Sequence, residues 1–320
     1  MKPLQRVLVI KLSSVGDFVS ALPAMQRIRE AHREARITLL TTPPFETLGR
    51  ASPFFNAVDP YALTSGAGEI LGLIGRVRSG RYERIYDLEN NAATNLLFQG
   101  LRPFPPAWSG TAVGCALPHR NPQRMKMHPL ERRAEQLRDA GIWPDAPVEP
   151  GSAPPPDLSW IMKKAQPQAS STRPYVVLAP GGSEAAPDQR WPAEKFAELA
   201  VHFDKEGYDV IVVGGPQESA LARVIQRRVS RTRDLTGRTD FAQIAVIGVR
   251  SALVVGNATG AVHLMAAAGA RTICLLPDGA DPQVEGPRGH VTLVQGPMAD
   301  IPMQTVAHAS LSLLPRPAQT

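Results

Sequence analysis

The chain has 320 residues, 43% of them apolar, which is enough for two domains that each bury a separate hydrophobic core. Its 35 Lys and Arg residues exceed its 29 Asp and Glu residues, and the net charge of +6 favours an anionic partner such as a nucleotide, a phosphorylated glycan or an acidic membrane surface. The basic residues are spread along the chain without a dense block or interleaved aromatic residues, so the composition argues against a nucleic-acid-binding protein.

Neither a membrane span nor a signal peptide is expected. The longest run without charge, Ser251–Ala270, has the length of a membrane span, but Gly256, Asn257 and His263 interrupt it, and it divides into a strand and a helix. The apolar run Val7–Ile10 is short and is followed by charged residues, unlike a signal peptide. A cytoplasmic location is therefore the default expectation.

The two cysteines are expected to be packing residues. Cys115 and Cys274 lie far apart without the spacing of a metal site, and Cys274 is inside the apolar run Ile273–Leu276. The sequence therefore predicts no metal site.

Strand and helix signals alternate in the first half of the chain, as in consecutive βα units. Arg6–Leu12 is expected to be a buried parallel strand because its apolar residues are continuous rather than alternating. A helix should begin near Gly16, with one apolar face formed by Phe18, Leu22, Met25 and Ile28. Further strands are expected at Arg36–Thr42, Phe55–Tyr61 and Arg84–Leu88, and further helices from Asn90 and over His128–Ile142.

Polar residues mark the end of one of these strands. Asp87 and Glu89 lie at the end of the run Arg84–Leu88. Polar residues at the carboxyl end of a strand face the ligand crevice of an open α/β sheet. This edge of the sheet is thus a candidate site.

The second half repeats the βα pattern after a proline-rich connector, Pro144–Pro156. We place the domain boundary there, which gives domains 1–157 and 158–320. The expected strands are Tyr175–Leu178, Val210–Val213, Leu253–Val255, Thr272–Leu276 and Val291–Val294, and the expected helices are Ala193–Glu206, Pro216–Val229, Asp240–Val249, a segment from Thr259 and Ile301–Leu314.

The stretch Val254–His263 contains a strand that runs into the start of a helix. Unpaired backbone N–H groups and the positive end of the helix dipole gather at such a junction, so it suits a phosphate or diphosphate. The alternative is an ordinary turn of an α/β fold that binds nothing.

Two common nucleotide motifs are missing. The NAD fingerprint needs three spaced glycines after the first strand and an acidic residue after the second, whereas this chain has Ser13-Ser-Val-Gly16 and Thr41-Thr-Pro-Pro44. The GxxxxGK[ST] pattern of a P-loop is absent as well. Both absences disfavour NAD-dependent and P-loop enzymes.

Several short motifs follow one another along the chain. They are Val9-Ile-Lys-Leu-Ser-Ser-Val-Gly-Asp17, Pro180-Gly-Gly-Ser183, Arg190-Trp-Pro192, Gly214-Gly-Pro-Gln-Glu218, Leu235-Thr-Gly237, Thr259-Gly260 with His263, and Asp281-Pro282. In this order they resemble the lipopolysaccharide heptosyltransferase family, glycosyltransferase family 9. The likeness covers nearly the whole chain and is strongest in residues 5–60 and 175–290.

The resemblance implies an α/β fold of the glycosyltransferase-B class, with two Rossmann-like domains facing across a central cleft. It also implies an inverting, metal-independent transfer from a nucleoside diphosphate sugar, usually ADP-heptose, to a lipid A core oligosaccharide. The nucleotide sugar is then a co-substrate, and no resident cofactor is expected.

By resemblance, Asp17 is the base that takes the proton of the acceptor hydroxyl. The residues by themselves favour helix capping for Asp17, because an aspartate at a helix start accepts backbone N–H bonds readily. The two interpretations conflict, since a helix N-terminus lowers the pKa of a carboxylate and makes it a poorer base.

The resemblance also implies that Lys11 lies on the acceptor side of the active site; a solvated lysine at a strand end is the alternative. His263 has two open interpretations, packing within its helix or facing the donor.

The donor is expected to bind in the second domain. A leaving diphosphate gains negative charge, which fixed N–H donors stabilise, and the resemblance places it at Thr259 and Gly260. The resemblance also places the loop of Gly181, Gly182 and Ser183 on the opposite wall of the donor site. Glu218 is the expected acceptor of the ribose hydroxyls, with Gln217 and Ser219 as alternatives one residue away.

Two donor-side positions depart from the family pattern. The usual aspartate before Thr-Gly is Ala258, and the usual lysine before Arg-Trp-Pro is Gln189, although Gln189 remains a candidate donor contact. A charge-assisted hydrogen bond contributes about 1.5–3 kcal/mol, so losing two of them weakens donor binding by roughly tenfold or more unless other residues compensate.

The sequence therefore predicts a cytoplasmic glycosyltransferase that acts on a lipid-linked or surface glycan, with peripheral association at the anionic inner membrane as a further expectation. The alternative is a catalytically silent relative with a degraded donor site, motivated by Ala258 and Gln189. A sugar-nucleotide epimerase of the same fold class is a third interpretation, and fold alone does not decide among them.

Overall fold

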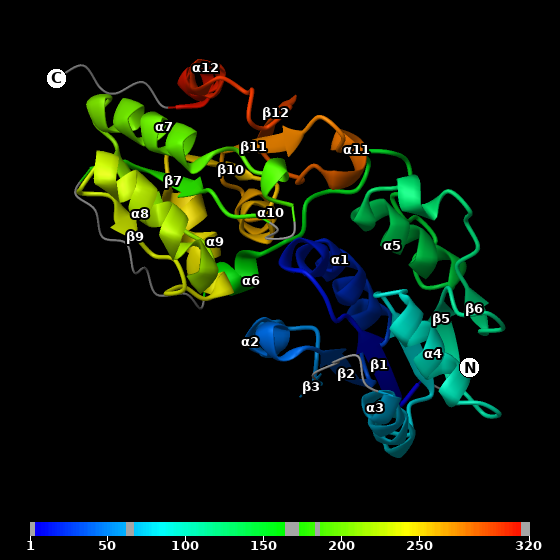
Figure 1. Cartoon of the computed structure of the whole chain (residues 1–320). Helices are drawn as coiled ribbons and strands as arrows, with labels where there is room; N and C mark the ends of the chain where they lie inside the picture. Colours follow the sequence, from blue (N-terminus) through cyan, green and yellow to red (C-terminus); the bar gives the residue numbers. More distant parts are fainter. Residues whose placement is uncertain (1–3, 62–66, 164–172, 183–185, 315–320) are drawn as a thin grey trace. The chain divides into compact units, whose positions relative to one another are not determined.

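Each half of the chain forms a parallel six-stranded sheet with helices on both faces (Figure 1). The computed structural model describes residues 4–61, 67–163, 173–182 and 186–314. The chain divides into an N-terminal unit, Met1–Ala153, and a C-terminal unit, Pro154–Thr320. This division falls inside the proline-rich segment that we expected to connect two domains.

The sheet of the N-terminal unit has the strand order β3-β2-β1-β4-β5-β6, and all neighbouring strands are parallel. Its central strand β1 is apolar and buried on both faces, as the continuous apolar run predicts. The strands are β1 (Arg6–Ile10), β2 (Arg36–Thr41), β3 (Ala57–Pro60), β4 (Arg84–Asp87), β5 (Ala107–Gly110) and β6 (Leu117–Pro118).

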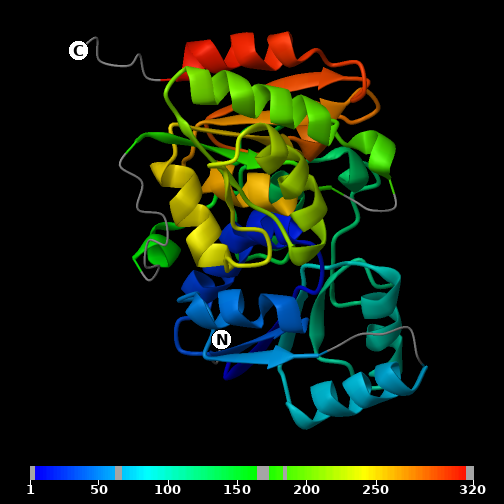
Figure 2. The ribbon, with the colours of Figure 1, turned by 60° about the vertical axis from the view of Figure 1, so that its left-hand side comes forward.

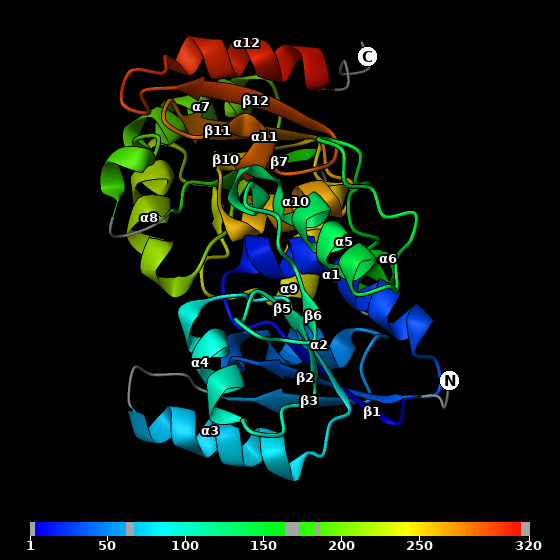
Figure 3. The same cartoon turned by 90° about the vertical axis from the view of Figure 1, so that its right-hand side faces the viewer.

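Helices cover both faces of this sheet. The predicted apolar face of α1 is confirmed, because Phe18, Leu22, Met25 and Ile28 are all buried. α1 packs beside α5 on one face, and α3 packs beside α4 on the other (Figure 3). The helical segments are α1 (Val15–Ala31), η1 (Pro43–Phe45), α2 (Glu46–Ala51), α3 (Ala67–Ser79), α4 (Ala92–Gly100), η2 (Arg124–Lys126) and α5 (Pro129–Asp139).

The sheet of the C-terminal unit has the order β12-β11-β10-β7-β8-β9 and is also parallel throughout. Numbered within each unit, both sheets therefore share the doubly wound order 3-2-1-4-5-6. The strands are β7 (Tyr175–Ala179), β8 (Asp209–Val212), β9 (Arg233–Asp234), β10 (Leu253–Asn257), β11 (Thr272–Pro277) and β12 (Val291–Gly296).

On one face of this sheet, α7 and α12 lie side by side (Figure 2). They share a core with α8 in which Trp191, Phe196 and Phe203 are almost completely buried. α9 and α10 pack against each other. The helical segments are α6 (Ser159–Met162), η3 (Pro187–Gln189), α7 (Ala193–Lys205), η4 (Pro216–Glu218), α8 (Ser219–Arg228), α9 (Phe241–Arg250), α10 (Gly260–Ala267), α11 (Pro282–Glu285) and α12 (Met303–Leu313).

The expected elements are present, with ends that differ by one to three residues, and the predicted helix over 216–229 begins as the 3₁₀ segment η4. The sequence did not indicate α3 or β5. The glycines of α3, including Gly72 and Gly75, lower its helix propensity, and tertiary packing of its buried Leu73 overrides this preference. β5 has only four residues, including the buried Trp108, which are too few for a recognisable pattern of apolar residues.

Both cysteines are buried, as expected of packing residues, and burial raises the pKa of the Cys274 thiol to about 12. Among the described residues, no helix combines the length and the apolar character needed to cross a membrane.

Gly256 is expected to tolerate no side chain, because β10 approaches β7 and α10 closely there. A Cβ added at Gly256 would lie 2.7 Å from the carbonyl oxygen of Ala179 and 2.7 Å from Cγ2 of Val262. We expect Gly256→Ala to lower the free energy of unfolding of the C-terminal unit by about 1–3 kcal/mol, measured by urea denaturation. Gly279→Ala is the control, since no described atom lies within 4 Å of its added Cβ. If both substitutions change the free energy of unfolding equally, the close packing of β7 and α10 against Gly256 would be contradicted.

Candidate active site

In an open α/β sheet, ligands bind outside the carboxyl ends of the strands, where the strand order reverses. In the N-terminal unit this point lies between β1 and β4, and in the C-terminal unit it lies between β7 and β10. The predicted Lys11 and Asp17 follow β1, and Thr259 and Gly260 follow β10. The two sheets therefore place the main candidate residues at their switch points.

Lys11 is completely buried, so a solvated lysine at the strand end is the wrong interpretation. Its ammonium donates to the backbone oxygen of Ser13 at 3.0 Å and forms ion pairs with Asp17 Oδ2, at 2.6 Å, and with Glu89 Oε2. A buried ammonium is stable only with such partners. Lys11 thus joins the loop after β1 to the loop after β4.

Asp17 lies in the first turn of α1 but does not cap the helix. Ser14 is the N-cap, and its hydroxyl accepts the backbone N–H of Asp17 at 3.3 Å. The interpretation of Asp17 as the helix cap is therefore wrong, because its carboxylate forms ion pairs with two cations. Its Oδ1 lies 2.6 Å from Nη2 of Arg133, and its Oδ2 contacts Lys11.

These two cations control the charge of Asp17. Burial raises the pKa of Asp17, but the guanidinium of Arg133 and the ammonium of Lys11 outweigh it and hold that pKa well below the usual range. The Asp17 side chain keeps 27% of its surface exposed, so an incoming hydroxyl can reach a carboxylate that is ionised at neutral pH.

Glu89 is the second carboxylate of the cluster. Its side chain is only 6% exposed, and besides Lys11 it accepts the backbone N–H of Leu12 at 2.9 Å and the hydroxyl of Ser13 at 2.5 Å. Burial raises the pKa of Glu89, but Lys11 outweighs this effect and the pKa is lowered. The sequence indicated only that Glu89 lies at a ligand-facing edge.

Arg133 comes from α5, and no motif in the sequence indicated it. Its side chain is 3% exposed, and its guanidinium also donates to the backbone oxygen of Leu88 at 3.3 Å. The amphipathic pattern of α5 predicted its helix but not that a buried arginine would reach Asp17.

A polar network supports the loop after β4. The carboxylate of Asp87 accepts the backbone N–H of Asn90 at 2.9 Å, and Gln136 Nε2 donates to the backbone oxygen of Asp87 at 2.9 Å. Burial raises the pKa of Asp87 to about 6 despite these bonds. Asn90 has a φ of 54°, a left-handed conformation that asparagine tolerates better than most residues.

Two further arginines are close to this cluster. Burial, together with the neighbouring Arg133 and Arg124, lowers the pKa of Arg132 to about 10. Arg124 donates to His119 Nδ1 at 3.4 Å, and Arg132 contacts Met125 Sδ at 3.7 Å. Within the described part of the chain, neither arginine forms an ion pair with a carboxylate. The N-terminal unit thus carries positive charge beside Asp17 that its own acids do not neutralise.

In the C-terminal unit, Thr259 is the N-cap of α10 and Gly260 is its first residue, as the strand-to-helix pattern predicts. The Thr259 hydroxyl forms no capping bond within the helix. Ala258 is exposed, while Thr259, Gly260 and His263 are half-buried. The start of α10 is therefore accessible to a ligand.

Asn257, at the end of β10, fixes the loops around this helix start. Its amide donates to the backbone oxygens of Pro180 at 3.0 Å and Gly181 at 2.9 Å, and its Oδ1 accepts the backbone N–H of Trp191 at 3.0 Å. Asn257 is 2% exposed. The side chain thus ties the Gly181–Gly182 loop and the Arg190-Trp191 motif to β10. Ser183 lies outside the described residues.

Glu218 is the last residue of η4, and its carboxylate accepts the backbone N–H of Gly215. The carboxylate also lies against Gly181, since a Cβ built on that glycine would overlap it. Glu218 is therefore at the carboxyl edge of the sheet, beside the loop after β7. Its expected contact with ribose hydroxyls remains a prediction.

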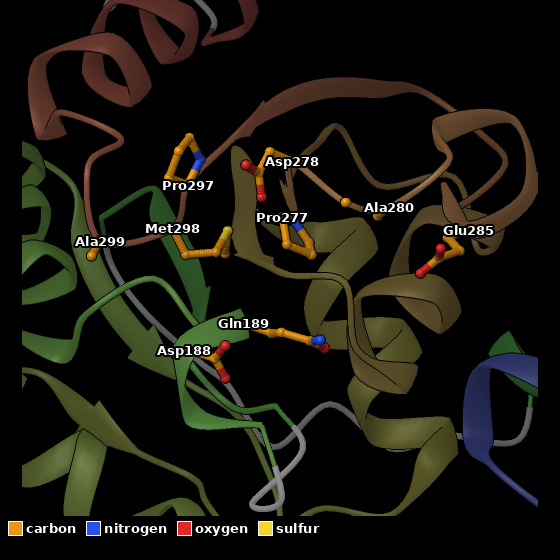
Figure 4. Close-up of a pocket in the computed structure, with 10 residues that line it drawn as sticks. Asp188, Gln189, Pro277, Asp278, Ala280, Glu285, Pro297, Met298 and Ala299 are labelled. Carbon is orange, nitrogen blue, oxygen red and sulfur yellow. The ribbon is translucent and has the colours of Figure 1, made fainter.

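Gln189 lines a pocket of about 430 Å³ at the ends of β11 and β12, and no residue of α10 is among those that line it (Figure 4). Asp188, Asp278 and Glu285 also line this pocket. Gln189 is exposed at the end of η3, and Figure 4 shows its amide extending into the open space. The amide of Gln189 is therefore accessible to a ligand in this pocket.

The described residues contain no group of three or more His, Cys, Asp or Glu side chains that could hold a metal ion. The expected independence from metal ions remains a prediction.

Comparisons with known proteins identify relatives over most of the chain. The model of glycosyltransferase family 9 (heptosyltransferase) matches residues 70–287. Lipopolysaccharide heptosyltransferase 2 of Escherichia coli (strain K12) is 27% identical over 286 residues, which are 82% of this chain and 80% of that protein.

Solved structures share the fold. E. coli ADP-heptose lps heptosyltransferase II superimposes with a TM-score of 0.79 at 23% identity and covers 97% of this chain and 98% of its own. The glycosyltransferase of family 9 from Veillonella parvula gives a TM-score of 0.78 at 18% identity, with 97% of both chains covered. The predicted α/β fold of the glycosyltransferase-B class is confirmed.

The ion pairs of Asp17 are expected to make stability depend on pH. Because its pKa in the folded state lies below the ordinary value of 3.8, the stability from these contacts is fully present above that pH and is lost as the pH falls through the lowered pKa. We expect Asp17→Asn to lower the free energy of unfolding of the N-terminal unit at pH 7 by about 1.5–3 kcal/mol, and the difference from the unsubstituted protein to shrink below about pH 4. Urea denaturation across this pH range measures both effects.

Asp59→Asn is the matched control, since Asp59 pairs with Arg76, whose side chain is 50% exposed. A surface pair of this kind contributes at most about 1 kcal/mol. A cost of Asp17→Asn that stays constant from pH 7 to pH 3 would contradict the ionic origin of the effect.

Proposed function

The chain belongs to glycosyltransferase family 9 (heptosyltransferase) and is a glycosyltransferase, and we propose that it transfers a heptose or a related sugar from a nucleoside diphosphate sugar to a lipopolysaccharide core or another surface glycan. The cluster of Lys11, Asp17 and Arg133 at the switch point of the N-terminal unit carries this proposal. ADP-heptose is the first candidate donor, because one structural relative is described as an ADP-heptose lps heptosyltransferase.

Asp17 is the proposed base. Both of its oxygens already accept hydrogen bonds, but each carboxylate oxygen has a further lone pair for the acceptor hydroxyl. The acceptor oxygen attacks the anomeric carbon as the diphosphate leaves from the opposite face of the sugar, and this geometry inverts the anomeric centre. The hydroxyl becomes strongly acidic as the new C–O bond forms, so a carboxylate of low pKa is able to take its proton at that stage.

Thr259 and Gly260 are the proposed contacts of the leaving diphosphate. Backbone N–H groups and the dipole at the start of α10 stabilise the negative charge that develops on it, so the transfer needs no metal ion. Glu218 holds the ribose hydroxyls from the neighbouring loop. Each contact uses a group that is fixed before the donor arrives.

The charge of the N-terminal unit supports an anionic acceptor. The charge of Asp17 acts on Arg132, and Arg124 lies beside Arg133; neither arginine forms an ion pair with a carboxylate among the described residues. Phosphate or carboxylate groups of a glycan core are suitable counter-ions. The enzyme acts in the cytoplasm, where the net charge of +6 favours peripheral binding to the anionic inner membrane surface.

Titration calorimetry with ADP-heptose and a panel of ADP-, UDP- and GDP-sugars tests the proposal. We expect at least one of them to bind and to support transfer to a core oligosaccharide acceptor. Asp17→Ala should reduce kcat by about 100-fold or more while the donor Kd stays within about twofold, because the base acts on the acceptor. If no sugar nucleotide of the panel binds, the proposed function is wrong. An unchanged kcat in Asp17→Ala would show that Asp17 is not the base.

The exposed positions Ala258 and Gln189 determine how well the usual donor binds. Ala258→Asp combined with Gln189→Lys restores the carboxylate and the ammonium that the family resemblance predicts there. We expect the double variant to bind ADP-heptose about tenfold more tightly or better, measured by calorimetry. Gln304→Lys, at an exposed position of α12, adds a positive charge elsewhere and should leave the Kd unchanged. Equal affinities of the double variant and the unsubstituted protein would show that neither position holds the donor.

A further inference from the structure

Glu89 connects the loops after β1 and β4 through a single buried carboxylate. Oε2 contacts the ammonium of Lys11 and accepts the backbone N–H of Leu12 at 2.9 Å and of Ser13 at 3.3 Å. Oε1 accepts the Ser13 hydroxyl at 2.5 Å and the Asn91 amide at 3.4 Å. Five donors thus converge on one side chain that is 6% exposed.

Asp17 and Glu89 share Lys11 but differ in access to solvent. The Asp17 side chain is 27% exposed and the Glu89 side chain 6%, while Lys11 is completely buried. An incoming hydroxyl therefore reaches Asp17 and not Glu89. Asp17 can therefore react with a substrate, whereas Glu89 can only position the residues that it contacts.

The charges of the four directly paired side chains balance, while Arg124 and Arg132 add positive charge beside them. Lys11 and Arg133 supply two positive charges, and Asp17 and Glu89 supply two negative charges. Without Glu89, Asp17 would be the one carboxylate of this cluster that faces both cations. Asp17 would then be held more firmly as an anion and would be a weaker base.

We propose that Glu89 is a positioning residue for the transfer reaction, which holds the ammonium of Lys11 in place and shares its charge with Asp17. This inference rests on the proposed function, because it takes Asp17 as the base. Glu89 acts through Lys11 and makes no contact with the acceptor. Because Lys11 divides its charge between two carboxylates, Asp17 stays ionised but remains a stronger base than it would be with Lys11 as its own partner alone.

The kinetic test is Glu89→Gln, which keeps the size of the side chain and one carbonyl oxygen but removes its charge. We expect kcat to fall about tenfold to a hundredfold, because Lys11 and Asp17 move from their productive positions. The donor Kd should remain within about twofold, since the proposed donor residues are in the C-terminal unit. An unchanged kcat, or a loss that appears only in donor affinity, would overturn the proposal.

Glu83→Gln is the matched control. Glu83 immediately precedes β4, and its carboxylate accepts the backbone N–H of Gln5 at 2.9 Å, at the opposite end of the strand from Glu89. It therefore resembles Glu89 in joining the segments of β1 and β4 but has no contact with Lys11. A similar fall of kcat in both variants would show that Glu89 is merely structural.

A second measurement does not depend on transfer. The buried ammonium of Lys11 should exchange its protons slowly and give a resolved ¹⁵N–¹H NMR signal, assigned by its loss in Lys11→Arg. We expect this signal to shift or to disappear in Glu89→Gln while Glu83→Gln leaves it unchanged. An unaltered signal in Glu89→Gln would overturn the proposal even in the presence of transfer activity.

The two measurements separate the failure of this inference from the failure of the proposed function. If the unsubstituted protein transfers no sugar, the proposed function fails, and the positioning role in transfer fails with it. The Lys11 signal still reports whether Glu89 holds the ammonium. If the unsubstituted protein transfers sugar but Glu89→Gln changes neither kcat nor the Lys11 signal, this inference fails and the proposed function stands.

Discussion

The N-terminal unit depends on a buried ammonium. Lys11 has no exposed surface, so its charge must be compensated inside the protein, and Asp17 and Glu89 provide that compensation from two different loops. Arg133 then binds the other oxygen of Asp17 from α5. Replacing any one of these residues removes at least one ion pair from the cluster. The loop after β1, the loop after β4 and α5 are therefore held together by the same charges that prepare Asp17 for its proposed role.

The two units use one strand order for different local chemistry. The point where the order reverses lies between β1 and β4 in the first sheet and between β7 and β10 in the second. Charged side chains gather at the first point. At the second, the buried Asn257 arranges backbone loops, and the start of α10 offers N–H groups. This division fits the proposed reaction, in which the acceptor needs a proton acceptor and the leaving diphosphate of the donor needs stabilisation.

The chain departs from the family pattern at two positions of the proposed donor site. Ala258 and Gln189 are both exposed, so the changes at these positions do not disturb the core. The framework around them is intact, because Asn257 and Trp191 still connect the loops and Trp191 donates through Nε1 to the backbone oxygen of Ile301 at 2.9 Å. A preserved framework with altered exposed contacts is what a change of donor preference requires. It also explains why family membership and donor identity are separate questions.

The sequence by itself determined the alternation of strands and helices, the buried faces of α1 and β1, and the start of α10, because these depend on local periodicity and on small residues at a turn. It did not reveal α3, whose packing overrides its glycines, nor the partners of Asp17. Glu89 lies 78 residues from Lys11, and Arg133 lies 116 residues from Asp17. Only the tertiary structure decided that these residues meet, because strand order and the placement of α5 on the sheet bring together charges that no local pattern connects.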